Sequence, residues 1–465
     1  MSPSSGKGDI ESVVSGGYCV GCGACAVQDR DYKIRESELG LYQAELIATS
    51  NSSSLVSEVC PFSAERNEDD LGHSLYGSDC QFDARIGYYK DIYAGHVTED
   101  EYRRNGSSGG LVTWVLSRLF TEGDIEGVIH VGETGRQGEL FEYRISESLD
   151  DIVGNSKSRY YPVHMDTVLQ QVRQTNKRYA FVGVPCFVKA VRLLAESDAG
   201  IAKNIKYCIS IFCGHFKTKA FAEMIAWQQK VLPSELVGIN FRVKNEHRPA
   251  NQYGVQVAKA EGASTRKLIP APTRDLYGMD WGLGYFKPKA CDWCDDIAGE
   301  AADLACGDAW LPEFSHLSGG TNIMVVRNAR LSVLIREGIE KGQLALTDQP
   351  VEKVYQSQSG NYRHRQEGLS VRIEKAVTQG LWHPRKRVKQ DSFKVSGERR
   401  RIYDLRVNIA EQSHITFRQA KARGSFLHFY LKMLPLELHY YFLNGRLLKG
   451  MGKSIYTLMN YIFRK

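Results

Sequence analysis

The chain has 465 residues, of which 42% are apolar and 25% charged. This length predicts two or three domains, and this composition allows a sizeable core and excludes wholesale disorder. The first residues lack the apolar stretch of a signal peptide, and no apolar run is long enough to span a bilayer. We therefore expect a cytoplasmic protein, whose eleven cysteines bind metal or react rather than form disulfides.

The net charge of +6 is unevenly distributed along the chain. Residues 385–465 contain 18 Lys or Arg and 5 Asp or Glu, a balance of +13, which leaves −7 for the rest. A basic tail on an acidic body predicts contact with an anionic surface or an acidic partner protein. We expect no nucleic-acid partner.

Along the chain, a polar and irregular region precedes a regular βα rhythm. Residues 1–90 contain five cysteines and little periodicity. From about residue 91, strand-like runs alternate with helical patterns, which predicts an α/β fold with a mixed or mostly parallel sheet and flanking helices. Residues 237–275 read as β-rich and residues 290–310 as a cysteine-rich loop. The expected strands are 92–97, 127–131, 179–184, 207–213 and 322–327, and the expected helices are 110–120, 165–175, 187–195 and 219–229.

Three cysteines near the N-terminus, Cys19, Cys22 and Cys25, have the spacing C-x2-C-x2-C, and Cys60 follows before a proline. Bacterial ferredoxins hold a 4Fe–4S cluster with such a run, whereas zinc knuckles use C-x2-C pairs. The pattern favours a ferredoxin-like iron–sulfur segment, with structural zinc or unligated core thiols as alternatives. The gap of 34 residues before Cys60 makes Cys80 a competitor for the fourth ligand.

A second set of cysteines lies later in the chain. Cys186 and Cys213 follow expected strands, at the edge of the sheet where α/β proteins place their sites. Cys291 and Cys294 form a further C-x2-C pair. A second 4Fe–4S cluster is one interpretation, and inert core thiols, a zinc pair or a dithiol are equally compatible with the spacing.

Several motifs occur in an order that resembles one known family. They are Cys19–Cys25 with Cys60-Pro61, Asn105–Gly110, Ser156–Tyr160, Gly183–Cys186, Phe212–His215, Cys291–Cys294 and Ala302–Trp310. Over about residues 15–345 the chain resembles the beta-subunit family of coenzyme F-420 hydrogenases and dehydrogenases. The resemblance implies an oxidoreductase with FAD and one or more 4Fe–4S clusters, and it favours a second cluster at Cys186, Cys213, Cys291 and Cys294.

With this resemblance, a glycine-rich loop becomes the candidate flavin site. Asn105, Ser107, Ser108, Gly109 and Gly110 precede an expected helix, whose free N–H groups and dipole favour a pyrophosphate. An ordinary loop and helix cap is the alternative. Further candidates for contact with the cofactor are Lys157, Ser158, Arg159 and Asp308, and His215 is a candidate proton donor to substrate.

We therefore expect three parts: residues 1–90 as a ferredoxin-like iron–sulfur region, 91–345 as an FAD-binding catalytic α/β domain with a second cluster, and 346–465 as a basic, mainly helical extension. The expected partners are ferredoxin or another redox protein and a small-molecule substrate, in an oligomer or larger redox complex. Alternative functions are a deazaflavin (F-420) oxidoreductase subunit and a zinc-stabilised binding module without enzyme activity.

The C-terminal extension ends in an amphipathic pattern. Leu447, Leu448, Met451, Ile455, Leu458, Met459 and Ile462 fall on one helical face, with Arg446, Lys449, Lys453, Arg464 and Lys465 around it. This pattern predicts either a peripheral helix at a membrane surface or a helix that packs on the protein body.

Overall fold

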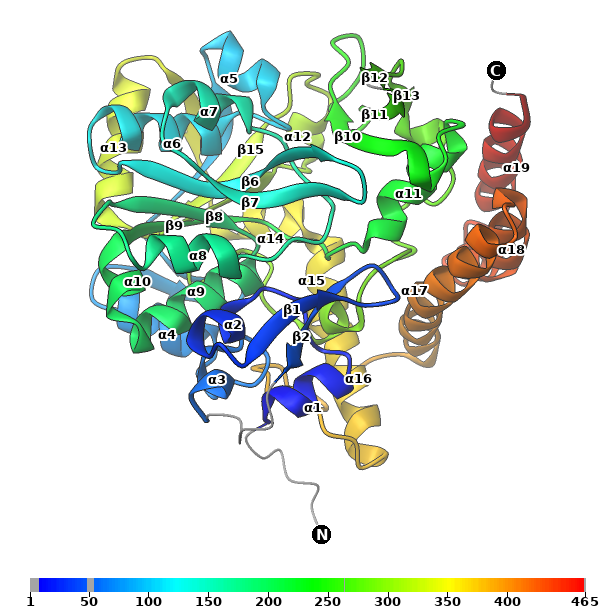
Figure 1. Cartoon of the computed structure of the whole chain (residues 1–465), viewed down its shortest axis with the longest axis horizontal. Coiled ribbons are helices and arrows are strands. Elements are labelled where there is room, and N and C mark those ends of the chain that lie inside the picture. The colour runs from blue at the N-terminus through cyan, green and yellow to red at the C-terminus, as the bar shows by residue number, and fades with distance from the viewer. Residues whose placement is uncertain (1–7, 48–53, 263, 464–465) are drawn as a thin grey trace.

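The computed structural model describes residues 8–47, 54–262 and 264–463, and a mixed sheet of eight strands is the largest sheet within these ranges (Figure 1). Its strands are β5 (Asp91–Val97), β6 (Gly127–Arg136), β7 (Glu139–Ser146), β8 (Tyr179–Gly183), β9 (Ile205–Ile211), β14 (Leu304–Asp308), β15 (Asn322–Val326) and β16 (Leu344–Asp348). Their order is β16-β5-β15-β14-β9-β8-β6-β7. Strands β14, β9, β8 and β6 run parallel, and the other neighbours pair antiparallel.

Helices cover both faces of this sheet because successive strand residues point to opposite sides. Val128 and Ile209 face one apolar cluster, which includes residues of α6 (Leu111–Thr121) and α13 (Ala329–Glu340). Ile129 and Phe181 face a second cluster on the opposite side. That side carries α8 (Asp166–Val172), α9 (Pro185–Ser197) and α10 (Ala199–Asn204), while α5 (Asp100–Asn105) and α7 (Leu149–Gly154) lie near α6.

The N-terminal region packs beside α8 and α9 (Figure 1). Its elements are α1 (Ile10–Ser15), α2 (Ala24–Gln28), the hairpin β1 (Tyr32–Glu36) and β2 (Tyr42–Leu46), α3 (Ser54–Val59), α4 (Glu68–Tyr76), and the hairpin β3 (Gln81–Asp83) and β4 (Gly87–Tyr89). Residues 1–7 and 48–53 of the expected region lie outside the described residues. The ferredoxin-like character of this region stays a prediction.

A small antiparallel sheet follows α11 (Lys219–Gln228), where the sequence reads as β-rich. It comprises β10 (Leu236–Val243), β11 (Gly254–Glu261), β12 (Ser264–Lys267) and β13 (Ala271–Pro272). Short turns of 3-10 helix, η1 (Pro233–Glu235), η2 (Thr273–Asp275) and η3 (Lys289–Trp293), and the helix α12 (Pro312–Ser315) occupy the connections.

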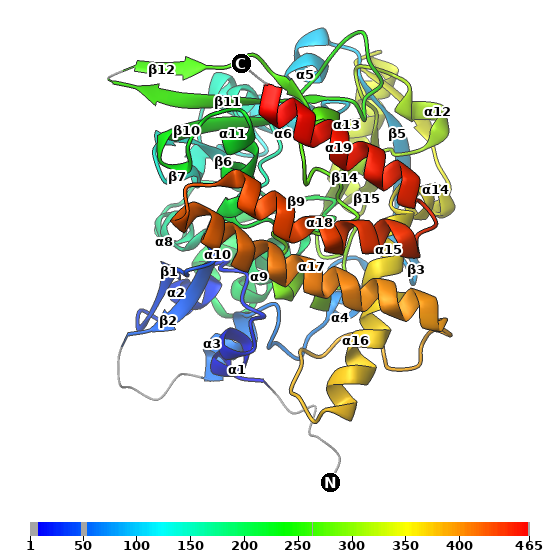
Figure 2. The ribbon, with the colours of Figure 1, turned by 90° about the vertical axis from the view of Figure 1, so that its right-hand side faces the viewer.

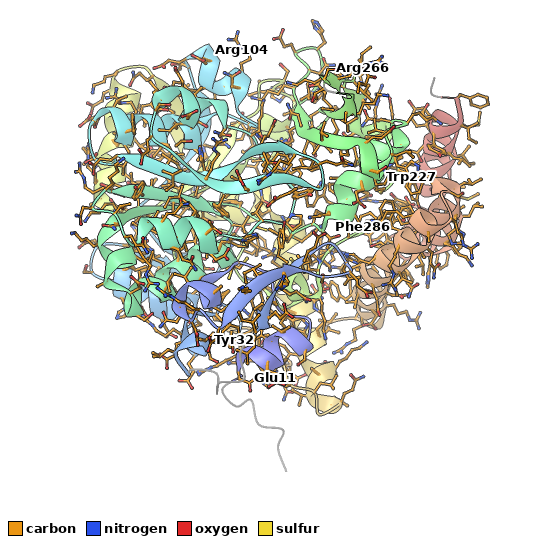
Figure 3. The ribbon with its side chains drawn as sticks, viewed as in Figure 1. Glu11, Tyr32, Arg104, Trp227, Arg266 and Phe286 are labelled. Carbon is orange, nitrogen blue, oxygen red and sulfur yellow. The ribbon has the colours of Figure 1, made fainter. Side chains whose placement is uncertain are left out.

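The C-terminal part is helical. It contains α14 (Val351–Ser357), α15 (Ser359–Arg365), α16 (Glu367–Thr378), α17 (Gly397–Ala422), α18 (Phe426–Leu443) and α19 (Leu447–Phe463). Helices α17, α18 and α19 form one layer on the side of the molecule (Figure 2). Trp227 and Phe286 on the body point toward this layer (Figure 3), and the rings of Phe286 and Phe429 stack with centroids 5.7 Å apart. The inner face of the extension therefore packs on the body.

The structure corrects one sequence expectation. Residues 304–308 lie in the expected loop but form β14, which pairs parallel with β9 and antiparallel with β15. Leu304, Ala305 and Cys306 are buried, so this short apolar run belongs in the middle of the sheet. All five expected strands and all four expected helices overlap elements of the structure.

Candidate functional site

Four cysteines of the N-terminal region line one small apolar cavity, and we call Cys19, Cys22, Cys25 and Cys60 the outer thiol group. Two glycines with positive φ, Gly21 and Gly23, shape the turn that carries three of them. A Cβ at Gly21 would lie 2.3 Å from the carbonyl oxygen of Tyr42, so this turn requires glycine.

The fourth member of the outer thiol group is Cys60, which follows α3. Its competitor Cys80 lies elsewhere, where its Sγ donates to the carbonyl oxygen of Arg327 at 3.2 Å. Ligation at this group stays a prediction, but the structure places Cys60 and not Cys80 beside the other three.

The outer thiols are buried in apolar surroundings. Burial raises the pKa of Cys19 to about 11 and raises the pKa of Cys25 well above its ordinary value. Soft thiolate ligands suit iron–sulfur clusters and zinc, whose positive charge stabilises the deprotonated form. In the described ranges no three His, Cys, Asp or Glu side chains gather around a position for a single metal ion. A cubane cluster binds each thiolate at a different iron atom.

Four further cysteines form a second group, and we call Cys186, Cys213, Cys291 and Cys294 the inner thiol group. Cys186 is the second residue of α9, and Cys213 lies in the loop after β9. Cys291 lies in η3, and Cys294 directly follows it. Burial, and then the negative charges of Cys294, Cys213, Cys291 and Cys22, raise the pKa of Cys186. The other three thiols of the inner group therefore lie within electrostatic reach of Cys186, and so does Cys22 of the outer thiol group.

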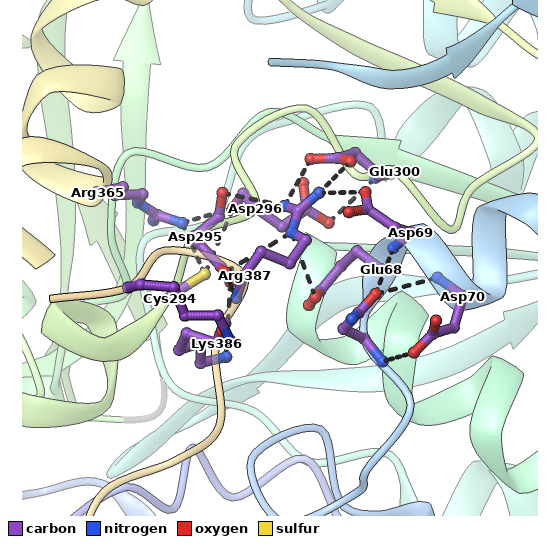
Figure 4. Close-up of polar contacts among 12 residues, drawn as sticks. Glu68, Asp69, Asp70, Cys294, Asp295, Asp296, Glu300, Arg365, Lys386 and Arg387 are labelled. Atoms are coloured by element: carbon purple, nitrogen blue, oxygen red, sulfur yellow. Dashed lines mark hydrogen bonds and ion pairs between the residues drawn. The ribbon is translucent and has the colours of Figure 1, made fainter. Parts of the chain in front are cut away.

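Sequence reasoning missed an arginine that contacts the inner thiol group. Arg365, at the end of α15, is 3% exposed. Its Nη1 donates to Sγ of Cys294 at 2.8 Å and to the carbonyl oxygen of Asp296 at 2.6 Å, and its Nη2 donates to the carbonyl oxygen of Gly214 at 2.7 Å (Figure 4). No motif signals this residue, because it lies in the extension, far along the chain from each cysteine.

A buried ionic network lies beside Cys294 (Figure 4). Arg387 donates to both carboxylate oxygens of Glu300, at 2.6 and 2.8 Å, and its backbone N–H donates to Asp295 at 3.0 Å. Asp69 of α4 accepts from the same guanidinium at 2.8 Å. The network therefore joins the N-terminal region, the loop after Cys294 and the C-terminal extension.

A cavity of about 260 Å³ lies next to the inner thiol group. Cys213 lines it, as do predicted residues from three loops and from the end of β14: Ser107, Ser108, Gly110, Lys157, Ser158, Arg159, His215 and Asp308. Two other predicted residues, Asn105 and Gly109, are not among the lining residues. A Cβ at Gly109 would lie 2.8 Å from the carbonyl oxygen of Gly95, so this glycine allows the loop to pack on β5.

The glycine-rich loop and the loop around Ser158 are held together at one wall of the cavity. The backbone N–H of Ser158 donates to Oγ of Ser107 at 2.8 Å, and Oγ of Ser156 donates to the carbonyl oxygen of Asn105 at 3.2 Å. Helix α6 begins here after Gly110, which has φ +86° and provides no side-chain cap. The start of a helix and cationic side chains thus face the same space.

The cavity wall is strongly basic. Arg159 is buried, and its Nε and Nη1 atoms have no hydrogen-bond partner, although Nη2 lies 3.3 Å from Glu133. Burial lowers the pKa of Arg159 to about 10, and burial with neighbouring Arg159 and Arg242 also lowers the pKa of Lys157. Buried guanidinium N–H groups without partners favour an anionic ligand.

Sequence reasoning missed two cations at this wall: Arg242 of β10 lines the cavity, and Lys244, which directly follows β10, supports the loop that forms the wall. Arg242 of β10 makes a bidentate ion pair with Asp308, at 2.6 and 3.2 Å. Nζ of Lys244 donates to the carbonyl oxygen of Ser108 at 2.6 Å and so supports the glycine-rich loop. Both lie in the β-rich segment, where an alternating pattern shows a strand but not which residues reach a distant cavity.

His215 lies in the cavity wall beside aromatic and cationic neighbours. Its ring centroid is 4.7 Å from that of Trp281, and its buried Nε2 has no hydrogen-bond partner. Burial, and then the charge of Lys217, hold the pKa of His215 well below its usual value, so the ring is neutral near pH 7. A neutral imidazole can donate or accept a hydrogen bond at this position.

Comparison with known protein families shows the class of this chain. Residues 92–170 match the N-terminal model, and residues 176–352 the C-terminal model, of the coenzyme F420 hydrogenase/dehydrogenase beta subunit. The two matches together cover more than half of the chain, which therefore belongs to this family. Its role is accordingly that of an oxidoreductase component in electron transfer, and the family resemblance expected from the sequence is confirmed.

The individual relatives have low sequence identity to this chain. Coenzyme F420 hydrogenase subunit beta of Methanothermobacter thermautotrophicus is 21% identical over 275 residues, 58% of this chain and 87% of that protein. Coenzyme F420-dependent sulfite reductase of Methanocaldococcus jannaschii is 21% identical over 71% of this chain, which spans 48% of that protein. A chain of the F420-reducing NiFe hydrogenase complex of Methanosarcina barkeri is 15% identical, with a TM-score of 0.49 over 65% of this chain and 99% of that one.

Proposed function

We propose that this chain is an iron–sulfur flavoprotein oxidoreductase that moves electrons between a one-electron donor such as ferredoxin and a small-molecule substrate. The observation that carries the proposal is a continuous row of sites. The outer thiol group neighbours the inner thiol group through Cys22 and Cys186, and Cys213 of the inner group lines the large cavity. Three candidate sites that neighbour one another in this order suit stepwise electron transfer.

In this proposal each thiol group holds a 4Fe–4S cluster and the cavity holds FAD. When bound, the clusters exchange single electrons and the flavin couples them to two-electron chemistry. The start of α6 and the Nε and Nη1 atoms of Arg159, which have no hydrogen-bond partner, support an anion site for the pyrophosphate or for a reduced flavin ring. Lys157 and Ser158 line the same wall.

We assign substrate contact to the part of the cavity around His215. Its Nε2 is buried without a partner, and Trp281 covers one side of the ring. In this role His215 hydrogen-bonds the substrate atom that gains or loses a proton, while the aromatic wall excludes water. We therefore propose His215 as a catalytic residue.

The test is to count the cofactors of anaerobically purified protein. Two cubane clusters predict about eight iron atoms per chain, together with bound FAD. Replacing Cys22 with Ala should remove about four of these iron atoms, slow reduction by ferredoxin and leave FAD bound. Cys208→Ala is the matched control, because Cys208 is a buried thiol of β9 outside both groups. Zinc in place of iron, or equal iron loss in both variants, would contradict the proposal.

The relatives favour one alternative donor. The hydrogenase subunit and the sulfite reductase described above are both named for coenzyme F420, so a deazaflavin is a candidate in place of ferredoxin. Anaerobic mixing with reduced coenzyme F420 or with reduced ferredoxin, followed by flavin absorbance, separates the two. A zinc-stabilised binding module is the non-enzymatic alternative, and it predicts a colourless protein that neither donor changes.

A further inference from the structure

Helices α18 and α19 use one face to pack and leave the other exposed (Figure 2). On α18 the inner residues Phe429, Met433 and Glu437 are fully buried. Helix α19 approaches α18 closely, since a Cβ at Gly450 would lie 2.3 Å from the ring of Tyr441. The hydroxyl of Tyr430 also donates to the carbonyl oxygen of Ser454 at 2.9 Å. The two helices thus form one fixed surface unit.

The exposed side of this unit is apolar, and we call it the outer apolar face. On α19 its residues recur every three or four positions, which places them on one stripe, and Leu448 is 84% exposed. Exposed apolar side chains that gather along one helical stripe are typical of an interaction site. The face consists of Leu427, Leu431, Phe442, Leu448, Met451, Ile455, Met459, Ile462 and Phe463.

The exposed charges that α18, α19 and their connection carry have one sign. Lys432 of α18 and Lys449 of α19 are exposed, and so is Arg446 in the connection between the two helices. The single carboxylate residue between positions 424 and 463 is Glu437, whose side chain is 1% exposed and faces the body. Lys453 does not belong to these exposed cations, because its Nζ lies 3.9 Å from a carboxylate oxygen of Asp280. The surface therefore combines exposed aliphatic side chains with cations and lacks an exposed carboxylate of its own.

We infer that the outer apolar face docks on an anionic lipid surface. Two helices lying in the plane of the interface would insert their aliphatic side chains at the acyl boundary, while Lys432 and Lys449 meet the phosphate headgroups. A second copy of this chain fits less well, because a two-fold interface would place the cations of one face against those of the other. Within the described ranges, no helix has the length and apolarity to cross a bilayer.

This surface belongs to the part of the chain beyond the family match, which ends at residue 352. The inner residues of the same helices stabilise the fold, so the two faces have separate tasks. Docking does not depend on which cofactors occupy the thiol groups or the cavity.

The experiment measures sedimentation of the full chain with vesicles. We expect binding to vesicles of phosphatidylglycerol and phosphatidylcholine in equal parts, weak binding to phosphatidylcholine alone, and release as salt shortens the reach of the charges. The double variant Lys432→Glu/Lys449→Glu should bind the anionic vesicles about 30-fold more weakly, since it loses two lysine contacts. The matched control is Lys203→Glu/Lys206→Glu, which makes the same charge change on α10 and β9, on the other side of the molecule (Figure 1).

A second pair of variants tests the apolar contribution. Leu448→Asp should weaken vesicle binding, whereas Leu381→Asp, at a residue that is 55% exposed outside this face, should not. Equal binding by both charge variants, or equal binding to neutral and anionic vesicles, would overturn the inference. So would a dimer, detected by light scattering, that Leu448→Asp separates into monomers, because the face would then belong to a second copy.

Discussion

At the scale of single residues, Arg365 has the most specific contact with the candidate redox centres. A hydrogen bond and a positive charge at a ligating thiolate stabilise the reduced, more negative form of an iron–sulfur cluster. The guanidinium donates to Cys294 at 2.8 Å and is itself fixed by two backbone carbonyl groups. It is therefore placed to act as a positioning residue that would raise the reduction potential of the inner cluster, the one proposed for the inner thiol group.

We predict that Arg365→Gln lowers the midpoint potential of the inner cluster by roughly 60 mV, which corresponds to a tenfold change in a one-electron equilibrium. The measurement is a redox titration followed by electron paramagnetic resonance. Arg363→Gln is the control, since it removes the same charge from an exposed position on the same helix. Equal potentials in the two variants would show that the contact with Cys294 has no electronic effect.

Single residues also show where sequence reasoning succeeds. The spacing of Cys19, Cys22 and Cys25 predicts their proximity, because a turn of seven residues leaves few other arrangements. Proximity between Arg365 and Cys294 depends on how α15 packs against η3, and no local pattern encodes it. The same holds for Arg242 and Asp308, which meet across 65 intervening residues.

At the scale of elements, α18 carries a buried acid. Oε2 of Glu437 lies 3.4 Å from the hydroxyl of Tyr285, which in turn contacts the hydroxyl of Tyr277 at 2.8 Å. Burial raises the pKa of Glu437 to about 7. The folded chain therefore binds this proton more tightly than the unfolded chain, whose glutamate has an ordinary value of 4.5.

The sign of the resulting pH dependence follows directly. The contribution of Glu437 is fully present below about pH 4.5 and is lost as the pH rises through about 7. We predict that Glu437→Gln gains on the order of 3 kcal/mol relative to the natural chain between pH 4.5 and pH 8. Melting temperatures of both proteins across this range provide the test, and parallel curves would contradict it.

Elements also differ in how well the sequence predicts them. Strands β5, β8 and β9 are apolar runs bordered by turns or helices, and their positions follow from the pattern. Strand β14 does not, because five residues with a cysteine and flanking carboxylates resemble a ligand loop. Its place between β9 and β15 depends on long-range pairing, which decides the strand order and brings Asp308 to the cavity.

At the scale of the whole molecule, Arg387 links three parts of the chain that are far apart in sequence. Its side chain contacts Asp69 of α4 and Glu300 of the loop after Cys294. The neighbouring residue of the extension, Lys386, contacts Asp295 of the same loop. Buried charges are costly unless they are paired, so removal of one partner leaves the others uncompensated. The extension is in this respect part of the core and not a tail attached to it.

We predict that Arg387→Met lowers the free energy of unfolding by about 3–5 kcal/mol. It should also expose residues 54–90 to limited proteolysis, because α4 loses its tie to the extension. The control Arg85→Met removes a partly exposed arginine from Asp83 and Glu352, and should cost about 1 kcal/mol or less. A similar loss in both variants would mean that the network does not couple these parts.

The arrangement of the two thiol groups has a consequence for how the protein matures. Three outer thiols lie within seven consecutive residues, so a short unfolded stretch already brings them together. The inner thiols span 109 residues, and they meet only after β8, β9 and η3 have reached their places. Closing so long a loop carries an entropic cost that the folded sheet must offset. In the proposed function, iron would therefore reach the three outer thiols during synthesis, whereas the inner group would become available only late in folding.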